Sequence, residues 1–138
     1  MVAAESGLAR VLLVDDNASM LARIRTVLQK SHQVVATAAS GQAALAAAAA
    51  LDPDVIVLDI SMPGMTGFEV ASRLRASHST APIVFLTVHE DQEHLEAARA
   101  AGGLGFVIKP RVQEDLLAAV REALAGRWFA STLGHDSF

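Results

Sequence analysis

The run Asp54–Asp59 constrains the fold of this chain more than any other feature of its sequence. Between its two acidic ends it reads Val-Ile-Val-Leu, with no polar residue at alternate positions. An unbroken apolar run of this kind is typical of a strand that is covered on both faces, as in a parallel sheet. Parallel neighbours must be joined by crossover connections, which are usually helices. The run therefore predicts an α/β fold.

Other short runs rich in Val, Ile and Leu alternate with segments of helical patterning. The predicted strands occupy residues 10–14, 33–37, 54–59, 82–87 and 104–108. The predicted helices occupy residues 20–28, 41–51, 68–76, 91–101 and 112–124. Either Asn17 or Ser19 can cap the first helix. A βα unit repeated five times predicts a doubly wound parallel sheet with helices on both faces.

Composition limits the class of protein. The chain has 138 residues, which fits one domain, and 52% of them are hydrophobic, which excludes a disordered chain. No apolar run approaches the roughly 18 residues of a membrane span, and the first ten residues do not form a signal peptide. There is no cysteine, the net charge is −4, and no basic cluster suits a nucleic acid. We predict a soluble, cytoplasmic domain with no contact to membranes or nucleic acid.

Polar side chains end four of the predicted strands. Asp15 and Asp16 end the first, Asp59 the third, Thr87 the fourth and Lys109 the fifth. In open parallel sheets the carboxyl ends of the strands share one edge, where ligands bind. Three carboxylates at one place repel each other unless a cation offsets their charge. Hard oxygen ligands without cysteine predict Mg²⁺.

Four motifs resemble the receiver domain of bacterial response regulators, and together they span residues 10 to 124. The motifs are Val-Asp-Asp-Asn at 14–17, Val-Leu-Asp-Ile-Ser-Met-Pro-Gly-Met-Thr-Gly-Phe-Glu at 57–69, Phe-Leu-Thr at 85–87 and Phe-Val-Ile-Lys-Pro at 106–110. The resemblance implies a flavodoxin-like (βα)5 sheet of five strands in the order 2-1-3-4-5. It also implies a flexible N-terminus at 1–9, a receiver at 10–125, and a tail or start of a linker at 126–138.

By this resemblance, Asp59 accepts a phosphoryl group from a sensor histidine kinase or a phosphotransfer protein. Mg²⁺ is expected on Asp15, Asp16, Asp59 and the backbone carbonyl of Ser61. Lys109 is expected to neutralise the phosphoryl oxygens. The domain is then a signalling phosphoacceptor with slow self-catalysed dephosphorylation rather than an enzyme, and it can form a homodimer when phosphorylated.

The same resemblance implies a switch. The Thr87 hydroxyl is expected to reach the phosphoryl group, and Phe106 is expected to turn from an exposed to a buried position. The Lys109–Pro110 peptide bond is expected to be cis.

Some positions depart from the family pattern. Val88 is larger than usual, and Phe106 stands where tyrosine is frequent. Ser61 and His89 flank the expected phosphoryl position. His89 and His94 are five residues apart, a spacing that puts them on different faces of one helix, so the sequence argues against a metal pair there.

The segment Ala125–Ser131 resembles the linker that follows receivers in regulators of the LuxR-output type. The chain is therefore expected to be either a stand-alone receiver or the receiver part of such a regulator. Trp128 and Phe129 are expected to pack back on the last helix.

Three other interpretations stay open. An FMN electron carrier needs a phosphate-binding loop after the first strand, where Asp15 and Asp16 would repel phosphate. A hydrolase of the haloacid dehalogenase type needs a second aspartate where this chain has Ser61. A degenerate receiver would act only as a protein-interaction module, although all five chemical residues are present.

Overall fold

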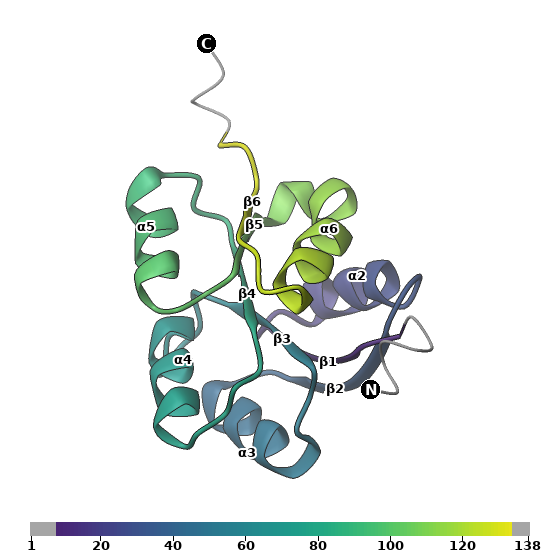
Figure 1. The fold of residues 1–138 in the computed structure, drawn as a ribbon, viewed down its shortest axis with the longest axis vertical. Helices are drawn as coiled ribbons and strands as arrows, with labels where there is room; N and C mark the ends of the chain where they lie inside the picture. Colours follow the sequence, from purple (N-terminus) through teal and green to yellow (C-terminus); the bar gives the residue numbers. More distant parts are fainter. Residues whose placement is uncertain (1–7, 134–138) are drawn as a thin grey trace.

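A computed structural model describes residues 8–133, which form one parallel sheet with helices on both faces (Figure 1). The strands are β1 (Arg10–Val14), β2 (Gln33–Ala38), β3 (Val55–Asp59), β4 (Ile83–Thr87), β5 (Gly105–Ile108) and β6 (Phe129–Ala130). The helices are α2 (Ala18–Leu28), α3 (Gly41–Leu51), α4 (Gly67–Ala76), α5 (Gln92–Ala100) and α6 (Val112–Leu124), with a short 3₁₀ helix, η1 (Lys109–Arg111). The strand order is β2-β1-β3-β4-β5-β6, with every pair parallel, so the flavodoxin-like order 2-1-3-4-5 is confirmed.

The unbroken apolar strands divide their side chains between two cores. On β3, Ile56 and Leu58 join the core beneath α3, α4 and α5, while Val55 and Val57 join the core beneath α2 and α6. In Figure 1 these two groups of helices lie on opposite sides of the sheet. Because both faces are covered, β3, β4 and β5 are buried at every position, whereas the edge strand β2 keeps exposed polar residues.

Side-chain caps begin α2, α3, α4 and α5, whereas α6 begins without one. Asn17 caps α2 and accepts from the backbone N–H of Met20 at 2.8 Å, so Asn17 rather than Ser19 is the cap. Thr66 and Glu69 form a capping box at the start of α4. Asp91 caps α5. Each cap satisfies a backbone donor that the first turn leaves free.

A sixth strand lies beyond the five that the sequence predicts. The backbone N–H of Phe129 donates to Leu104 O at 3.0 Å, and that of Ser131 donates to Phe106 O at 2.8 Å. Trp128 packs with the core on the α5 side, where the Arg99 guanidinium lies 4.8 Å from its ring centre. The prediction that Trp128 and Phe129 pack on the last helix is therefore wrong for Trp128. Phe129 does pack with the core beneath α6.

Two predicted segments lie partly outside the described residues. These are the N-terminus at 1–9, of which residues 1–7 are not described, and the tail at 126–138, of which residues 134–138 are not described. Ala9 is buried, and its carbonyl accepts from the backbone N–H of Gln33 at 2.9 Å. Within residues 8–133 no helix has the length and apolar character required to cross a membrane.

Candidate functional site

The acidic residues after β1 differ sharply in exposure. Asp15 is completely buried, its Oδ1 accepts from the backbone N–H of Asn17 at 2.9 Å, and its own backbone N–H donates to Ala38 O. Asp16, the next residue, is exposed. A ligand atom of each lies within 4.8 Å of one on Asp59. The strand end therefore holds one carboxylate inside the sheet edge and one at its rim.

Asp59 ends β3 and is 2% exposed. Its Oδ1 accepts from the backbone N–H of Ser61 at 3.2 Å, because the chain turns back at once after the strand. That return brings Gly67 against the strand end, where its N–H donates to Ile60 O at 2.8 Å. A β-carbon at Gly67 would lie 2.4 Å from the carbonyl oxygen of Asp59, so only glycine fits this approach.

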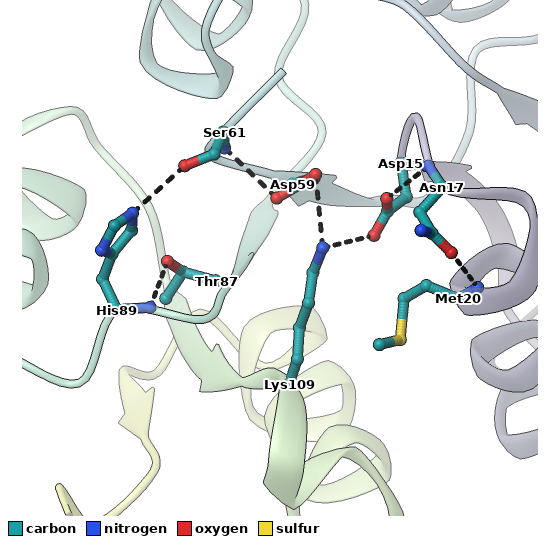
Figure 2. Close-up of polar contacts among 8 residues, drawn as sticks. All are labelled: Asp15, Asn17, Met20, Asp59, Ser61, Thr87, His89 and Lys109. Atoms are coloured by element: carbon teal, nitrogen blue, oxygen red, sulfur yellow. Dashed lines mark hydrogen bonds and ion pairs between the residues drawn. The ribbon is translucent and has the colours of Figure 1, made fainter.

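Lys109 connects the two buried carboxylates (Figure 2). Its Nζ lies 2.8 Å from Asp15 Oδ2 and 3.4 Å from Asp59 Oδ2. Neither of these two buried oxygens accepts a hydrogen bond from a described residue. The positive charge of the Lys109 ammonium therefore offsets the negative charge of the two carboxylates. Removing Lys109 would be costly, because it leaves two buried carboxylates uncompensated, whereas Lys109 keeps Asp15 as a partner when Asp59 loses its charge.

The prediction of a cis Lys109–Pro110 bond is wrong, since residues 8–133 contain no cis peptide bond. Pro110 instead lies in the 3₁₀ turn η1, where proline is tolerated because its missing N–H has no partner to lose. With this trans bond Lys109 still reaches both carboxylates.

Burial and the neighbouring charges shift the pKa values of Asp59 and Lys109. Burial, and then the negative charge of Asp15, raise the pKa of Asp59 to about 6, against the opposing effect of Lys109. Burial alone would lower the pKa of Lys109, but its close contact with the Asp15 carboxylate and the negative charges of Asp59 and Asp15 raise it above its ordinary value. The nucleophile candidate is thus a carboxylate that the fold makes easier to protonate, held beside a permanent cation.

The donor set fits Mg²⁺. Asp15, Asp16 and Asp59 offer carboxylate oxygens within 4.8 Å of one another, and Oδ2 of both Asp15 and Asp59 lacks a hydrogen bond to the described residues. A hard divalent cation prefers such oxygens and keeps several waters, which the exposed side of Asp16 leaves room for.

Thr87 lies one residue beyond the partner of Asp59 in the β3–β4 register, which pairs Asp59 with Leu86. It is completely buried, and its Oγ1 accepts from the backbone N–H of His89 at 2.9 Å. The His89 ring in turn lies 3.3 Å from Ser61 Oγ, so the loop after β4 touches the loop after β3 (Figure 2). Val88, which lies between Thr87 and His89 in the sequence, is 61% exposed.

Phe106 does not start from an exposed position, so that part of the predicted switch is wrong. Its side chain is completely buried in the same core as Leu133, with Trp128 and Ala130 packed against that core. The physical reason is β6, which pairs Ala130 with Phe106 and removes the free edge of β5.

The two histidines beside the site lie together, contrary to the spacing argument. That argument placed both on one helix, but His89 lies in the loop before α5 and His94 in its first turn. Their rings stack, with centres 4.1 Å apart and planes 7° apart. Sequence reasoning missed this pair because it applied helix spacing to His89, which lies before the predicted helix start at residue 91. The Asp91 cap was the signal that could have shown it.

Comparison with known proteins identifies the family. The family described as "Response regulator receiver domain" matches residues 11–121. The nitrate/nitrite response regulator protein NarL of Escherichia coli K12 is 34% identical over 125 residues, which are 89% of this chain and 58% of NarL. The transcriptional regulatory protein PrrA of Mycobacterium tuberculosis is 37% identical over 128 residues, which are 93% of this chain and 55% of PrrA. The chain thus spans little more than half the length of these relatives.

Solved structures agree. A two-component response regulator of the LuxR family from Aurantimonas has a TM-score of 0.84 and 31% identity, covering 91% of this chain and 90% of that one. The signal receiver domain of the putative response regulator NarL from Mycobacterium tuberculosis has a TM-score of 0.81 and 30% identity, covering 87% and 98%. Together with the strand order and the acidic edge of the sheet, these matches show that the chain belongs to the receiver-domain family of two-component response regulators.

Proposed function

We propose that this chain is a phosphoacceptor receiver in which Asp59 takes a phosphoryl group from the phosphohistidine of a sensor kinase or a phosphotransfer protein. The observation that carries the proposal is the Lys109 ammonium, which lies 2.8 Å from Asp15 and 3.4 Å from Asp59 at the carboxyl edge of the sheet. A buried carboxylate beside a fixed cation is suited to attack an electrophile whose oxygens carry negative charge.

In the transfer, an oxygen of Asp59 attacks phosphorus and forms an O–P bond while the P–N bond of the phosphohistidine breaks. The departing imidazole keeps the electron pair. The attacking carboxyl must be ionised, and a pKa of about 6 leaves it mostly ionised at neutral pH. Lys109 is proposed to pair with the phosphoryl oxygens after transfer, because its ammonium already lies 3.4 Å from Oδ2 of the Asp59 carboxylate that would receive the phosphoryl group.

The proposed metal ligands are Asp15, Asp16, Asp59 and the backbone carbonyl of Ser61. When bound there, Mg²⁺ would supply positive charge that offsets the charge of the phosphoryl group. Asp15 and Asp59 are positioned for this role by the turns that start at each strand end, where each Oδ1 accepts a backbone N–H two residues later.

Thr87 is the proposed sensor of phosphorylation. Its hydroxyl oxygen already accepts from the His89 backbone, and a hydroxyl can donate its proton to another oxygen at the same time. A phosphoryl group on Asp59 would offer that acceptor and so bias the loop after β4. Phe106, buried under β6 from the outset, would respond by repacking inside the core.

The partners follow from the same proposal. A sensor histidine kinase or phosphotransfer protein supplies the phosphoryl group in the cytoplasm, and a homodimer can follow. The likeness to a LuxR-family regulator supports a stand-alone receiver or the receiver part of a LuxR-type regulator. The proposed domain limits are residues 10–125 for the receiver and 126–138 for the tail or linker, of which residues 129–133 pack onto the receiver through β6 and Leu133.

Intact-mass measurement with a small phosphodonor and Mg²⁺ tests the proposal. The wild-type chain should gain the mass of one phosphoryl group, and the Asp59→Asn variant should gain none. Asp52→Asn is the matched control, because it makes the same substitution at an exposed aspartate that lies before β3. It should gain the same mass as the wild-type chain.

Equal labelling of wild type and Asp59→Asn would reject Asp59 as the acceptor. No labelling of any variant, by the small donor or by a kinase, would favour the degenerate receiver. Thr87→Ala should still be labelled, but amide NMR of residues 88–91 should lose the change that beryllofluoride causes in wild type.

A further inference from the structure

A second cluster of side chains that can ligate a metal lies beside the proposed phosphorylation site, and none of its side chains is among the proposed Mg²⁺ ligands. His89, Asp91 and His94 each offer a ligand atom, and these atoms lie within 4.8 Å of one another. All three residues are half-buried, with the His94 side chain 33% and the Asp91 side chain 44% exposed, so an ion from solvent can reach them.

The Asp91–His94 pair already has the spacing of neighbouring ligands. His94 Nδ1 lies 2.9 and 2.8 Å from the two oxygens of Asp91. Metal–nitrogen and metal–oxygen bonds of about 2.0–2.2 Å place adjacent ligand atoms roughly 3.4 Å apart in tetrahedral geometry, so the pair must open by less than about 1 Å. The backbone N–H of His94 also donates to Asp91 Oδ2, which fixes the carboxylate at the helix start. An ion can therefore replace the proton that the pair shares, with little movement.

His89 supplies the third ligand by turning its ring. The two imidazoles are stacked with almost parallel planes, and a ring nitrogen presents its lone pair in the plane of its own ring. Parallel rings cannot both aim at one ion, so His89 must rotate. When it rotates, the His89 ring loses one described polar contact, which joins its Nε2 to Ser61 Oγ at a long 3.3 Å.

We propose that His89, Asp91 and His94 form a second cation site for a divalent transition metal of the Zn²⁺ class, with water completing the coordination. Two imidazoles and one carboxylate are ligands that Zn²⁺ accepts, whereas Mg²⁺ prefers oxygen alone. The acidic cluster around Asp59 offers only carboxylates, so the two sites select different ions. A bound ion would join the loop after β4 to the first turn of α5.

Calorimetric titration of the full chain with Zn²⁺, in excess Mg²⁺ that occupies the carboxylate cluster, tests the site. One ion should bind per chain. His89→Gln, His94→Gln and Asp91→Asn should each weaken the affinity by at least about 10-fold, because the loss of even an outer-shell partner of a ligand costs about 10–100-fold. Asn is itself a good helix cap, so Asp91→Asn keeps α5 while changing the ligand.

His78→Asn is the matched control, because it removes an exposed imidazole outside the cluster at a residue with φ of 68°, a conformation that Asn tolerates. Its affinity should equal that of wild type. NMR of the histidine ring nitrogens should show Zn²⁺-dependent shifts at His89 and His94 in wild type.

Three results would overturn the proposal: no saturable Zn²⁺ binding, unchanged affinity in the variants, or an equal loss in His78→Asn. Asp59→Asn should bind Zn²⁺ as wild type does, so the second site and the proposed phosphoacceptor role succeed or fail separately.

Discussion

Asp59 has a pKa of about 6 in the folded chain, because burial and the charge of Asp15 outweigh the ion pair with Lys109. The ordinary value is 3.8. Between about pH 4 and pH 6 the folded chain therefore binds a proton that the unfolded chain has lost, and the free energy of unfolding falls as the pH rises through this window. Above about pH 6 Asp59 is ionised in the folded chain as well, and its buried charge then lowers the free energy of unfolding by the full amount.

Asp59→Asn should accordingly be more stable than wild type by about 1–2 kcal/mol at pH 7 to 8, and the difference should shrink as the pH falls toward 4. Urea unfolding of both proteins across this range measures it. The exposed Asp52→Asn variant provides the baseline. A gap between Asp59→Asn and wild type that is the same at every pH would contradict this account of the site.

At the scale of an element, the β3–α4 connection depends on Gly67. A β-carbon there would meet Asp59 O at 2.4 Å and Ile60 Cα at 2.9 Å, both backbone atoms that cannot turn aside. Gly67→Ala should therefore lower stability by about 1–3 kcal/mol. It should also slow labelling at Asp59, because the strand end must shift.

Gly64→Ala is the comparison in the same loop. Its φ of 83° strains an alanine, but nothing lies within 4 Å of the added β-carbon. We expect it to cost about 1 kcal/mol of stability and to leave labelling unchanged. Urea unfolding and the initial labelling rate separate the two effects, and equal labelling rates in both variants would reject the steric role of Gly67.

The sixth strand contributes stability through both its ladder and its side chains. Ser131 is buried, its Oγ accepts from the Ile108 N–H at 3.2 Å, and Leu133 is 3% exposed. A chain that ends after Gly126 loses these contacts. The free energy of unfolding of this shortened chain should be lower than that of wild type by about 2–4 kcal/mol. Its Ile108 amide proton should also exchange faster with solvent.

The control is a chain that ends after Leu133, which keeps β6 and the buried side chains of Ser131 and Leu133. It should match wild type in urea unfolding and amide exchange. If ending the chain after Gly126 changes neither measurement, β6 makes no contribution to the fold.

At the scale of the whole molecule, a cation on the acidic edge is linked to global stability. The stabilisation should follow RT ln(1 + [Mg²⁺]/Kd) and reach about 2.7 kcal/mol at a concentration of roughly 100 times Kd. Mg²⁺ should thus raise the melting temperature of wild type. Asp16→Asn should remove most of that rise, since it takes one carboxylate from the three.

The matched control here is Asp54→Asn, whose carboxylate contacts the Arg10 backbone N–H at the opposite end of β1, far along the strand from the acidic edge. Its response to Mg²⁺ should equal that of wild type. A melting temperature that does not depend on Mg²⁺ in wild type would contradict the metal site.

Much of this fold could be predicted because its strands are covered on both faces. Runs such as Asp54–Asp59 have no polar interruption, and that pattern shows where strands lie without any knowledge of their neighbours. The place of the site followed from topology, since side chains that end parallel strands share an edge. Lys109 and Asp59 were therefore expected to lie near each other, and their ion pair agrees.

The rest depended on contacts that no periodic pattern records. β6 has two residues, Phe129 and Ala130, too few to show an alternation, and its place depends on the free edge of β5. The burial of Phe106 follows from that pairing and could not be inferred alone. The stacking of His89 and His94 depends on the conformation of the loop before α5, which the spacing of the two residues in the sequence does not determine.

The parallel direction of β6 sets the route by which the polypeptide leaves the domain. Helix α6 carries the chain back from the carboxyl edge of the sheet, and β6 then runs forward again beside β5, so that Ser131 follows Ala130 toward the level of Ile108. The last described residues of the chain therefore lie toward the same edge of the sheet that holds Asp59 and Lys109. A movement of Lys109 at that edge has a short path through β5 to β6, because the two strands share backbone hydrogen bonds.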